Sequence, residues 1–81
     1  MAKTNRYPPE GFTERLYHVW LASGMTQKEV ALQIGYERKA VRLWLYGDNI
    51  PSVLALARLC RLFEVSADYL LFGKEELAGG K

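Results

Sequence analysis

The sequence has few of the residues that enzyme and metal sites usually need. Its 81 residues include a single cysteine, Cys60, and a single histidine, His18. One cysteine cannot form a disulfide within the chain, and no group of cysteine, histidine and acidic residues has metal-ligand spacing. We therefore expect no metal, no cofactor and no enzymatic activity. Cys60 is expected to be a small buried residue in a reduced, cytoplasmic protein, and His18 an exposed helix residue.

Long apolar runs are also missing. No segment approaches the roughly 18–20 apolar residues that cross a membrane, and residues 1–10 lack the apolar core of a signal peptide. The glycines form no loop of the kind that holds nucleotide phosphates. We therefore expect no membrane attachment, and no small-molecule substrate is evident.

Strand signals are equally sparse, because valine, isoleucine and threonine are few and do not alternate with polar residues. Hydrophobic residues nevertheless make up 49% of the chain, which is enough for one packed core. Many of them recur at helical spacing. The pattern predicts an all-α, compact five-helix bundle over residues 10–73, with a flexible arm over 1–9 and a tail over 74–81.

Capping signals and apolar stripes delimit these five helices. Thr26 and Glu29 have the spacing of a capping box, in which each side chain bonds the backbone N–H of the other residue. Further helix starts or stops are expected at Gly24, Gly35, Gly47, Ser52, Ser66 and Gly73. The inward-facing residues are expected to be Phe12, Leu16, Val19, Trp20, Val30, Ala31, Ile34, Ala40, Val41, Trp44, Val53, Leu56, Leu59, Cys60, Phe63 and Leu70.

Two short helical patterns on either side of Gly35 form the most informative part of the chain. Helices this short must be held by packing, and glycine allows a sharp bend between them. With Val41 of the later helix turned inward, helical geometry places Arg38, Lys39 and Arg42 on or beside the outer face. A helix whose first turn projects in this way suits the major groove of DNA, where amino-terminal residues can reach base edges.

The charge distribution supports a nucleic-acid partner only weakly. The net charge is +2. Residues 38–42 contain three basic residues and no acid, whereas the chain from Asp48 onward has five acidic and four basic residues. A solvated helix face is therefore an alternative explanation of the basic residues.

The segment from Thr26 to Gly73 resembles the helix-turn-helix domain of the phage repressor and Cro type, also called the XRE family. The matching residues are, in order, Gln27, Val30, Ala31, Gly35, Val41, Trp44, Gly47, Pro51 and the closing VSADYLLFG. The likeness covers about residues 13–73 and implies a lambda-repressor-like fold. It also implies a sequence-specific regulator of transcription that binds double-stranded DNA, a repressor that occupies an operator with its third helix, about residues 37–46.

The resemblance also implies roles for individual residues. The DNA-binding set is Gln27, Glu37, Arg38, Lys39, Arg42, Tyr46 and Asn49. Gln27 would touch the DNA backbone and could also reach a base at the groove edge. The next four lie where the family reads bases, and the last two lie where it grips phosphate. Two alternatives stay open: Glu37 could cap its helix, and Tyr46 could serve a packing role.

One departure from the family pattern concerns the contact between the first and third helices. Family members often have arginine at the position of Trp20 and glutamate at the position of Leu45, which form an ion pair. Here both residues are apolar. We expect a Trp20–Leu45 contact to replace the ion pair, because such exchanges are often neutral or stabilising.

Apolar residues outside the core suggest a second interaction. Leu71 and Phe72 cannot join Leu70 in one small core, and Leu54 lies off the buried stripe of its helix. Because similar proteins dimerise through this region, these three residues, Leu54, Leu71 and Phe72, are expected to form a homodimer interface. They could instead cover the open end of a monomer's core. For the whole protein, the alternative function is a protein-interaction module of the same fold without sequence-specific DNA binding.

Overall fold

Helices account for all regular secondary structure in residues 8–74, the part of the chain that the structure, a computed structural model, describes. They are α1 (Phe12–Ser23), α2 (Gln27–Ile34), α3 (Arg38–Tyr46), α4 (Val53–Phe63) and α5 (Ala67–Phe72). The expected all-α fold of five helices is confirmed. None of these helices is long and apolar enough to cross a membrane. Most of the expected arm and tail lies outside the described residues, so these two boundaries stay predictions.

The helix ends follow the capping signals of the sequence. The Thr26 hydroxyl accepts from the Glu29 backbone N–H at 3.0 Å, and the Glu29 carboxylate accepts from the Thr26 N–H at 2.8 Å, so the capping box is confirmed. Ser52 and Ser66 cap α4 and α5 through their hydroxyls. The expected stops Gly24, Gly35, Gly47 and Gly73 all have left-handed backbone conformations. Local chemistry therefore sets most of the helix boundaries.

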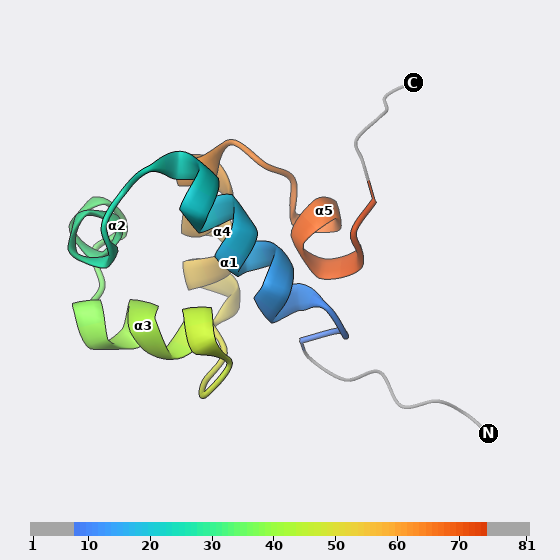
Figure 1. Cartoon of the computed structure of the whole chain (residues 1–81), viewed down its shortest axis with the longest axis horizontal. Coiled ribbons are helices and arrows are strands. Elements are labelled where there is room, and N and C mark those ends of the chain that lie inside the picture. The colour runs from blue at the N-terminus through green and yellow to red at the C-terminus, as the bar shows by residue number, and fades with distance from the viewer. Residues whose placement is uncertain (1–7, 75–81) are drawn as a thin grey trace.

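The five helices pack around α1 and α4, which cross near the middle of the molecule (Figure 1). α1 contacts α3, α4 and α5, while α2 contacts α3 and α4. α5 packs against α1 and α4 at the end away from α2. Among the described residues, the backbone of α3 approaches α1 and α2 but not α4. The pair α2–α3 therefore projects from one end of the bundle.

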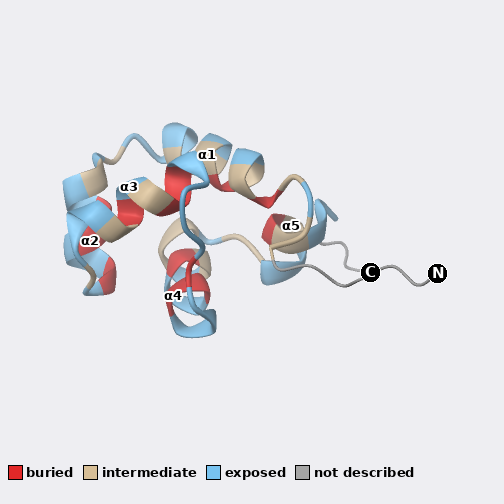
Figure 2. Cartoon of the chain, turned by 90° about the horizontal axis from the view of Figure 1, so that it is seen from below, coloured by how far each residue is buried: buried red, intermediate tan, exposed pale blue. Residues whose placement is uncertain are grey.

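The buried side chains face one another inside the bundle (Figure 2). Each fully buried leucine or phenylalanine contributes about 1.5–3 kcal/mol relative to an exposed one. The cluster consists of Phe12, Leu16, Val30, Ala31, Ile34, Val41, Trp44, Leu45, Ala55, Leu56, Leu59 and Leu70. Cys60 packs against it but is only half-buried, and this burial raises the pKa of its thiol.

The expected core is wrong at the start of α4. Val53 was expected to be buried but is 78% exposed, whereas Ala55 is fully buried. Pro51, just before the helix, is itself buried. The inward face of the first turn of α4 is therefore that of Ala55 and Leu56, and Val53 lies on the opposite, exposed side. Helical periodicity alone cannot reveal where a core ends.

The last helix anchors the domain through Leu70, which is fully buried as expected. Phe72 is 58% exposed, also as expected. Leu71 was expected to be exposed but is half-buried and packs against the core cluster. The reason is that α5 lies along both α1 and α4, which cover more than one of its faces.

Arg15 of α1 holds the end of α5 in place. Its Nε donates to the Leu70 carbonyl at 2.9 Å and its Nη2 to the Leu71 carbonyl at 2.8 Å. Nη2 also lies 3.3 Å from the Glu10 carbonyl. These acceptors include carbonyls that a helix leaves unsatisfied at its carboxyl end, where a cation is favourable. One guanidinium thus joins the beginning and the end of the domain.

Candidate nucleic-acid interface

Residues 35–37 connect α2 to α3 in a tight turn. Gly35 has φ of 78°, a conformation that favours glycine. The backbone N–H groups of Gly35 and Tyr36 both donate to the Ala31 carbonyl, at 2.9 and 3.0 Å. Ala31 is buried in the core. The turn therefore starts α3 immediately after α2 and in a new direction, as the sequence indicated.

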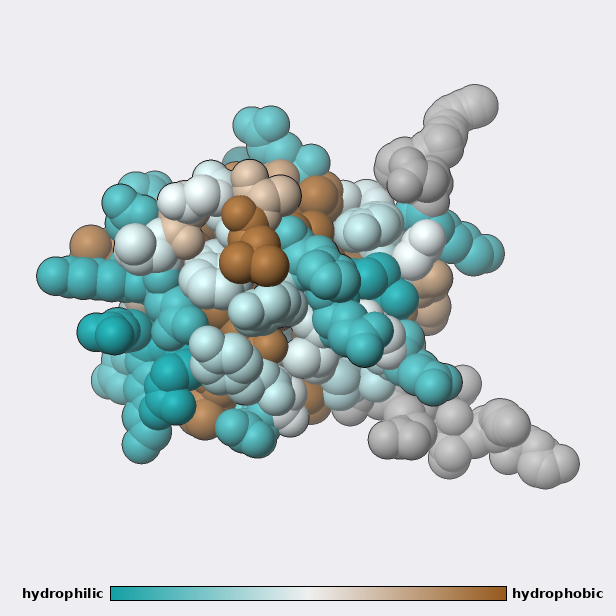
Figure 3. Space-filling view, in the orientation of Figure 1, coloured by the Kyte–Doolittle hydropathy of each residue, from teal (hydrophilic) through white to brown (hydrophobic). Residues whose placement is uncertain are grey.

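α3 has one buried face and one basic face. Val41, Trp44 and Leu45 are buried, while Arg38, Lys39 and Arg42 are exposed. Hydrophilic side chains gather over the end of the molecule where α2 and α3 lie (Figure 3). The expected outward placement of the three cations is confirmed.

Glu37 lies at the N-cap position of α3, so the helix begins at Arg38, one residue later than expected. Its side chain is exposed and makes no capping hydrogen bond. The capping role that the sequence left open for Glu37 is therefore wrong in this structure. The carboxylate remains free to meet an external donor beside Arg38.

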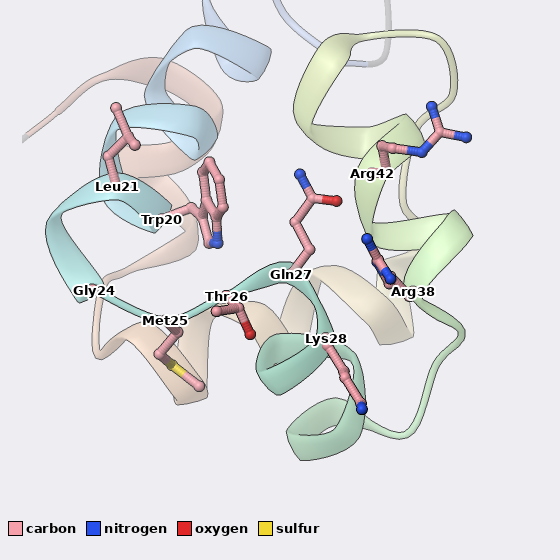
Figure 4. Close-up of a pocket in the computed structure, with 9 residues that line it drawn as sticks. All are labelled: Trp20, Leu21, Gly24, Met25, Thr26, Gln27, Lys28, Arg38 and Arg42. Carbon is pink, nitrogen blue, oxygen red and sulfur yellow. The ribbon is translucent and has the colours of Figure 1, made fainter.

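An open hollow lies between the end of α1, the start of α2 and α3 (Figure 4). Gln27, the first residue of α2, is half-buried, and its side chain extends between Trp20 and the side of α3 that carries Arg42. Lys28 is exposed on the same rim, a position that sequence patterns did not single out. The residues lining the hollow are Trp20, Leu21, Gly24, Met25, Thr26, Gln27, Lys28, Arg38 and Arg42. The structure thus brings Gln27 together with two of the expected base-reading residues.

Comparison with known proteins decides the family. A family model described as "Helix-turn-helix" matches residues 21–70, which is more than half of the chain. The chain belongs to the XRE-type helix-turn-helix family. Members of this family are DNA-binding regulators of transcription.

Two relatives illustrate how far the likeness extends. The chain is 31% identical over 64 residues to the HTH-type transcriptional activator BcrR of Enterococcus faecalis, which covers 79% of this chain and 31% of that protein. A crystal structure of a transcriptional regulator from Listeria innocua superposes with a TM-score of 0.70 at 23% identity, covering 85% of this chain and 64% of that one. The second likeness shows the fold. The chain spans less than two thirds of either protein.

Two further expected site residues of this helix-turn-helix domain flank the end of α3. Tyr46 is 53% exposed, and its ring centroid lies 6.2 Å from that of Tyr17. Asn49 is exposed, and its side-chain oxygen accepts from the Ile50 N–H at 2.9 Å. That bond uses the amide oxygen, so the Asn49 amino group remains available as a donor. For Tyr46, the contact with Tyr17 means that the ring packs partly on α1, while its exposure leaves the hydroxyl available for an external hydrogen bond.

The apolar pair that departs from the family pattern also lies in this helix-turn-helix domain. Leu45 is 4% exposed, and Trp20 is half-buried against the cluster that contains Leu45. Neither side chain is turned into solvent, although their direct contact stays a prediction. The Nε1–H of Trp20 is buried and has no hydrogen-bond partner within residues 8–74. Burial of an unpaired donor is unfavourable, so the packing of the indole must offset that cost.

Proposed function

We propose that this chain is a sequence-specific DNA-binding regulator that inserts α3 into the major groove of double-stranded DNA. The observation that carries the proposal is the division of α3 into a buried face and an exposed face with three cations. A groove about 12 Å wide admits such a helix. Membership of the helix-turn-helix family supports the same reading.

The proposed contacts divide into base reading and backbone binding. Arg38 and Lys39, in the first turn of α3, donate to guanine O6 and N7, and Glu37 accepts from cytosine N4. Arg42, one turn later on the exposed face, also reads bases. The phosphate contacts come from Gln27, Lys28, Tyr46 and Asn49, which carry donors on either side of α3.

The direction of regulation belongs to the proposal as well. We propose repression, in which the protein occupies an operator that overlaps a promoter and blocks polymerase. The relative BcrR is named an activator. Whether this chain represses or activates transcription therefore needs a separate measurement. A reporter gene behind a promoter that contains the selected operator should lose expression when the chain is produced. A rise in expression would mean that the chain activates transcription instead of repressing it, and it would leave the DNA-binding proposal intact.

A second copy of the chain completes the proposed complex. Leu54 and Phe72 are 55% and 58% exposed, and Leu71, which directly precedes Phe72, is half-buried. Apolar side chains of this kind are typical of the centre of a homodimer interface. A two-fold dimer would place two copies of α3 on successive major grooves, roughly 34 Å apart.

Selection of bound fragments from random duplex DNA tests the proposal most directly. We expect one enriched sequence, with two-fold symmetry if the dimer forms. Binding to this duplex should weaken with salt by a slope of roughly 0.9 per neutralised phosphate. If no sequence is enriched, the proposal of sequence-specific DNA binding is wrong and the alternative, a protein-interaction module, is favoured.

A pair of matched variants shows whether α3 is the reading element. Arg38→Ala combined with Arg42→Ala should lower the affinity for the selected duplex by about 30-fold or more, since each good bidentate base contact contributes about 1–3 kcal/mol. The control combines Arg61→Ala with Lys74→Ala, which removes the same charge from α4 and from the residue after Gly73, where both side chains are exposed. Equal losses in both variants would contradict the proposed role of α3.

A further inference from the structure

Arg58 of α4 contacts the carboxyl end of the neighbouring helix α2. Its Nη1 donates to the Ile34 carbonyl at 3.0 Å, although the two residues are 24 positions apart in the chain. Ile34 is the last residue of α2, and a helix leaves its final carbonyls without internal partners. The positive charge also interacts favourably with the carboxyl end of the helix dipole. Arg58 therefore links α4 to α2 at the point where the turn begins.

The same guanidinium also contacts the turn itself. Its Cζ lies 5.7 Å from the ring centroid of Tyr36, within the range of a cation–π interaction. Tyr36 in turn meets Trp44 of α3 edge-on, with ring centroids 5.3 Å apart and an interplanar angle of 68°. Trp44 is 5% exposed and belongs to the core. Arg58, Tyr36 and Trp44 thus form a continuous row from α4 through the turn to α3, which we call the Arg58 brace.

This row matters because the start of α3 lacks a cap of its own. Glu37 makes no capping hydrogen bond, whereas Thr26, Ser52 and Ser66 cap α2, α4 and α5. The backbone of α3 does not approach α4 within the described residues, so side chains must make any connection between these helices. Tyr36 directly precedes Glu37, and its orientation therefore affects where the first turn of α3 points.

We propose that Arg58 is a positioning residue for DNA recognition. It holds the turn so that Arg38 and Lys39 meet the base edges, and it does not touch DNA itself. This inference rests on the proposed function, in which α3 reads the major groove. Looser placement of the first turn should reduce binding to the selected sequence more than binding to unrelated DNA, because base contacts depend on geometry and phosphate contacts tolerate more movement.

The test compares Arg58→Met with Arg61→Met in the full chain. Both changes remove one positive charge from α4, both residues are exposed, and Arg61 lies three residues further along the helix. Affinity is measured for the selected duplex and for a scrambled duplex over a range of salt concentrations. We expect Arg58→Met to lose about tenfold on the selected duplex and less on the scrambled one, with the salt slope unchanged. Arg61→Met should bind both like the original protein. Arg58→Lys should recover part of the loss, because it keeps a donor for the Ile34 carbonyl.

Two results with DNA would overturn the inference. Equal behaviour of Arg58→Met and Arg61→Met would show that only the charge of α4 matters. A salt slope reduced by about 0.9, with the same loss on every sequence, would make Arg58 a phosphate contact instead.

Amide hydrogen exchange in the free protein separates the brace from the DNA-binding proposal. Arg58→Met should speed exchange at the first hydrogen-bonded amides of α3, those of residues 41–43, while Arg61→Met should not. A chain that binds no duplex would defeat the proposed function alone. Unchanged exchange in Arg58→Met would defeat the brace, whatever the chain binds.

Discussion

Side chains on the proposed interface differ in what they can contribute to recognition. Arg38 lies in the first turn of α3, from which a guanidinium can bridge two acceptors of one guanine. Asn49 lies beyond the helix and offers one amino group. The guanidinium of Arg38 can therefore discriminate between bases, whereas the amino group of Asn49 suits a phosphate oxygen, which is present in every DNA sequence.

We therefore expect Arg38→Ala and Asn49→Ala to weaken binding in different ways. Arg38→Ala should cost about 1–3 kcal/mol on the selected duplex and remove the base preference at one position. Asn49→Ala should weaken binding to all sequences alike. The measurement is affinity for a series of duplexes with single base-pair changes. A preference that survives Arg38→Ala at every position would remove Arg38 from the base-reading set.

Glu64 has a backbone conformation that is unfavourable for a residue with a Cβ atom. It ends α4 with φ of 58°, the one left-handed residue other than glycine within residues 8–74. For residues with a Cβ atom this conformation costs about 1–2 kcal/mol. Glu64→Gly should therefore raise the free energy of unfolding, by about 0.5–1 kcal/mol after the greater flexibility of glycine in the unfolded chain is subtracted. Urea unfolding measures the change, and Glu64→Ala, which keeps Cβ, should show no such gain.

At the scale of helices, local signals were sufficient for most of the fold. The capping box at Thr26 and the glycine stops involve residues within a few positions of one another, so the chain sequence alone specifies them. The apolar stripe that contains Phe12 and Leu16 was also predicted, because its residues recur within one helix. The burial of Pro51 and Leu71 was not predicted, because it depends on which other segments pack against the ends of α4 and α5. The bond from Arg58 to Ile34 joins distant segments and leaves no periodic signal.

The contact between α1 and α3 offers a test of the apolar exchange at Trp20 and Leu45. Leu45→Glu alone should destabilise the domain by about 3 kcal/mol or more, because it places an unpaired charge at a site that is 4% exposed. Adding Trp20→Arg should recover much of that loss by restoring the ion pair seen in the family. A double-mutant cycle by urea unfolding measures the coupling. Independent, additive effects of the two changes would show that these side chains do not meet.

For the whole molecule, the central question is whether two copies act together. The exposed Phe72 and Leu54 come from α5 and α4, which contact each other, and α5 lies at the end of the molecule away from α2 (Figure 1). Sequence patterns predicted that both would be exposed. These patterns could not predict whether a second copy covers the two side chains, since the same exposure fits a dimer interface or the solvent-exposed surface of a monomer.

Phe72→Lys should therefore separate the dimer into monomers without unfolding the domain. The added charge would lie in the centre of the interface, where it loses solvation on association. Sedimentation equilibrium should show the mass of a dimer for the original chain and of a monomer for the variant. Leu32→Lys, at a site on α2 that is 72% exposed and on a helix that contributes no residue to the proposed interface, is the control. A monomer for the original chain at all concentrations would contradict the dimer.

The hydrogen bonds of Arg15 also affect how the domain forms during synthesis. A ribosome releases a chain from its amino end, so α1 emerges well before the carbonyls of Leu70 and Leu71. The guanidinium of Arg15 has two of its acceptors only after those residues have appeared. A nascent chain that stops after α4 therefore lacks these two hydrogen bonds of α1, and they form only when residues 70 and 71 have emerged.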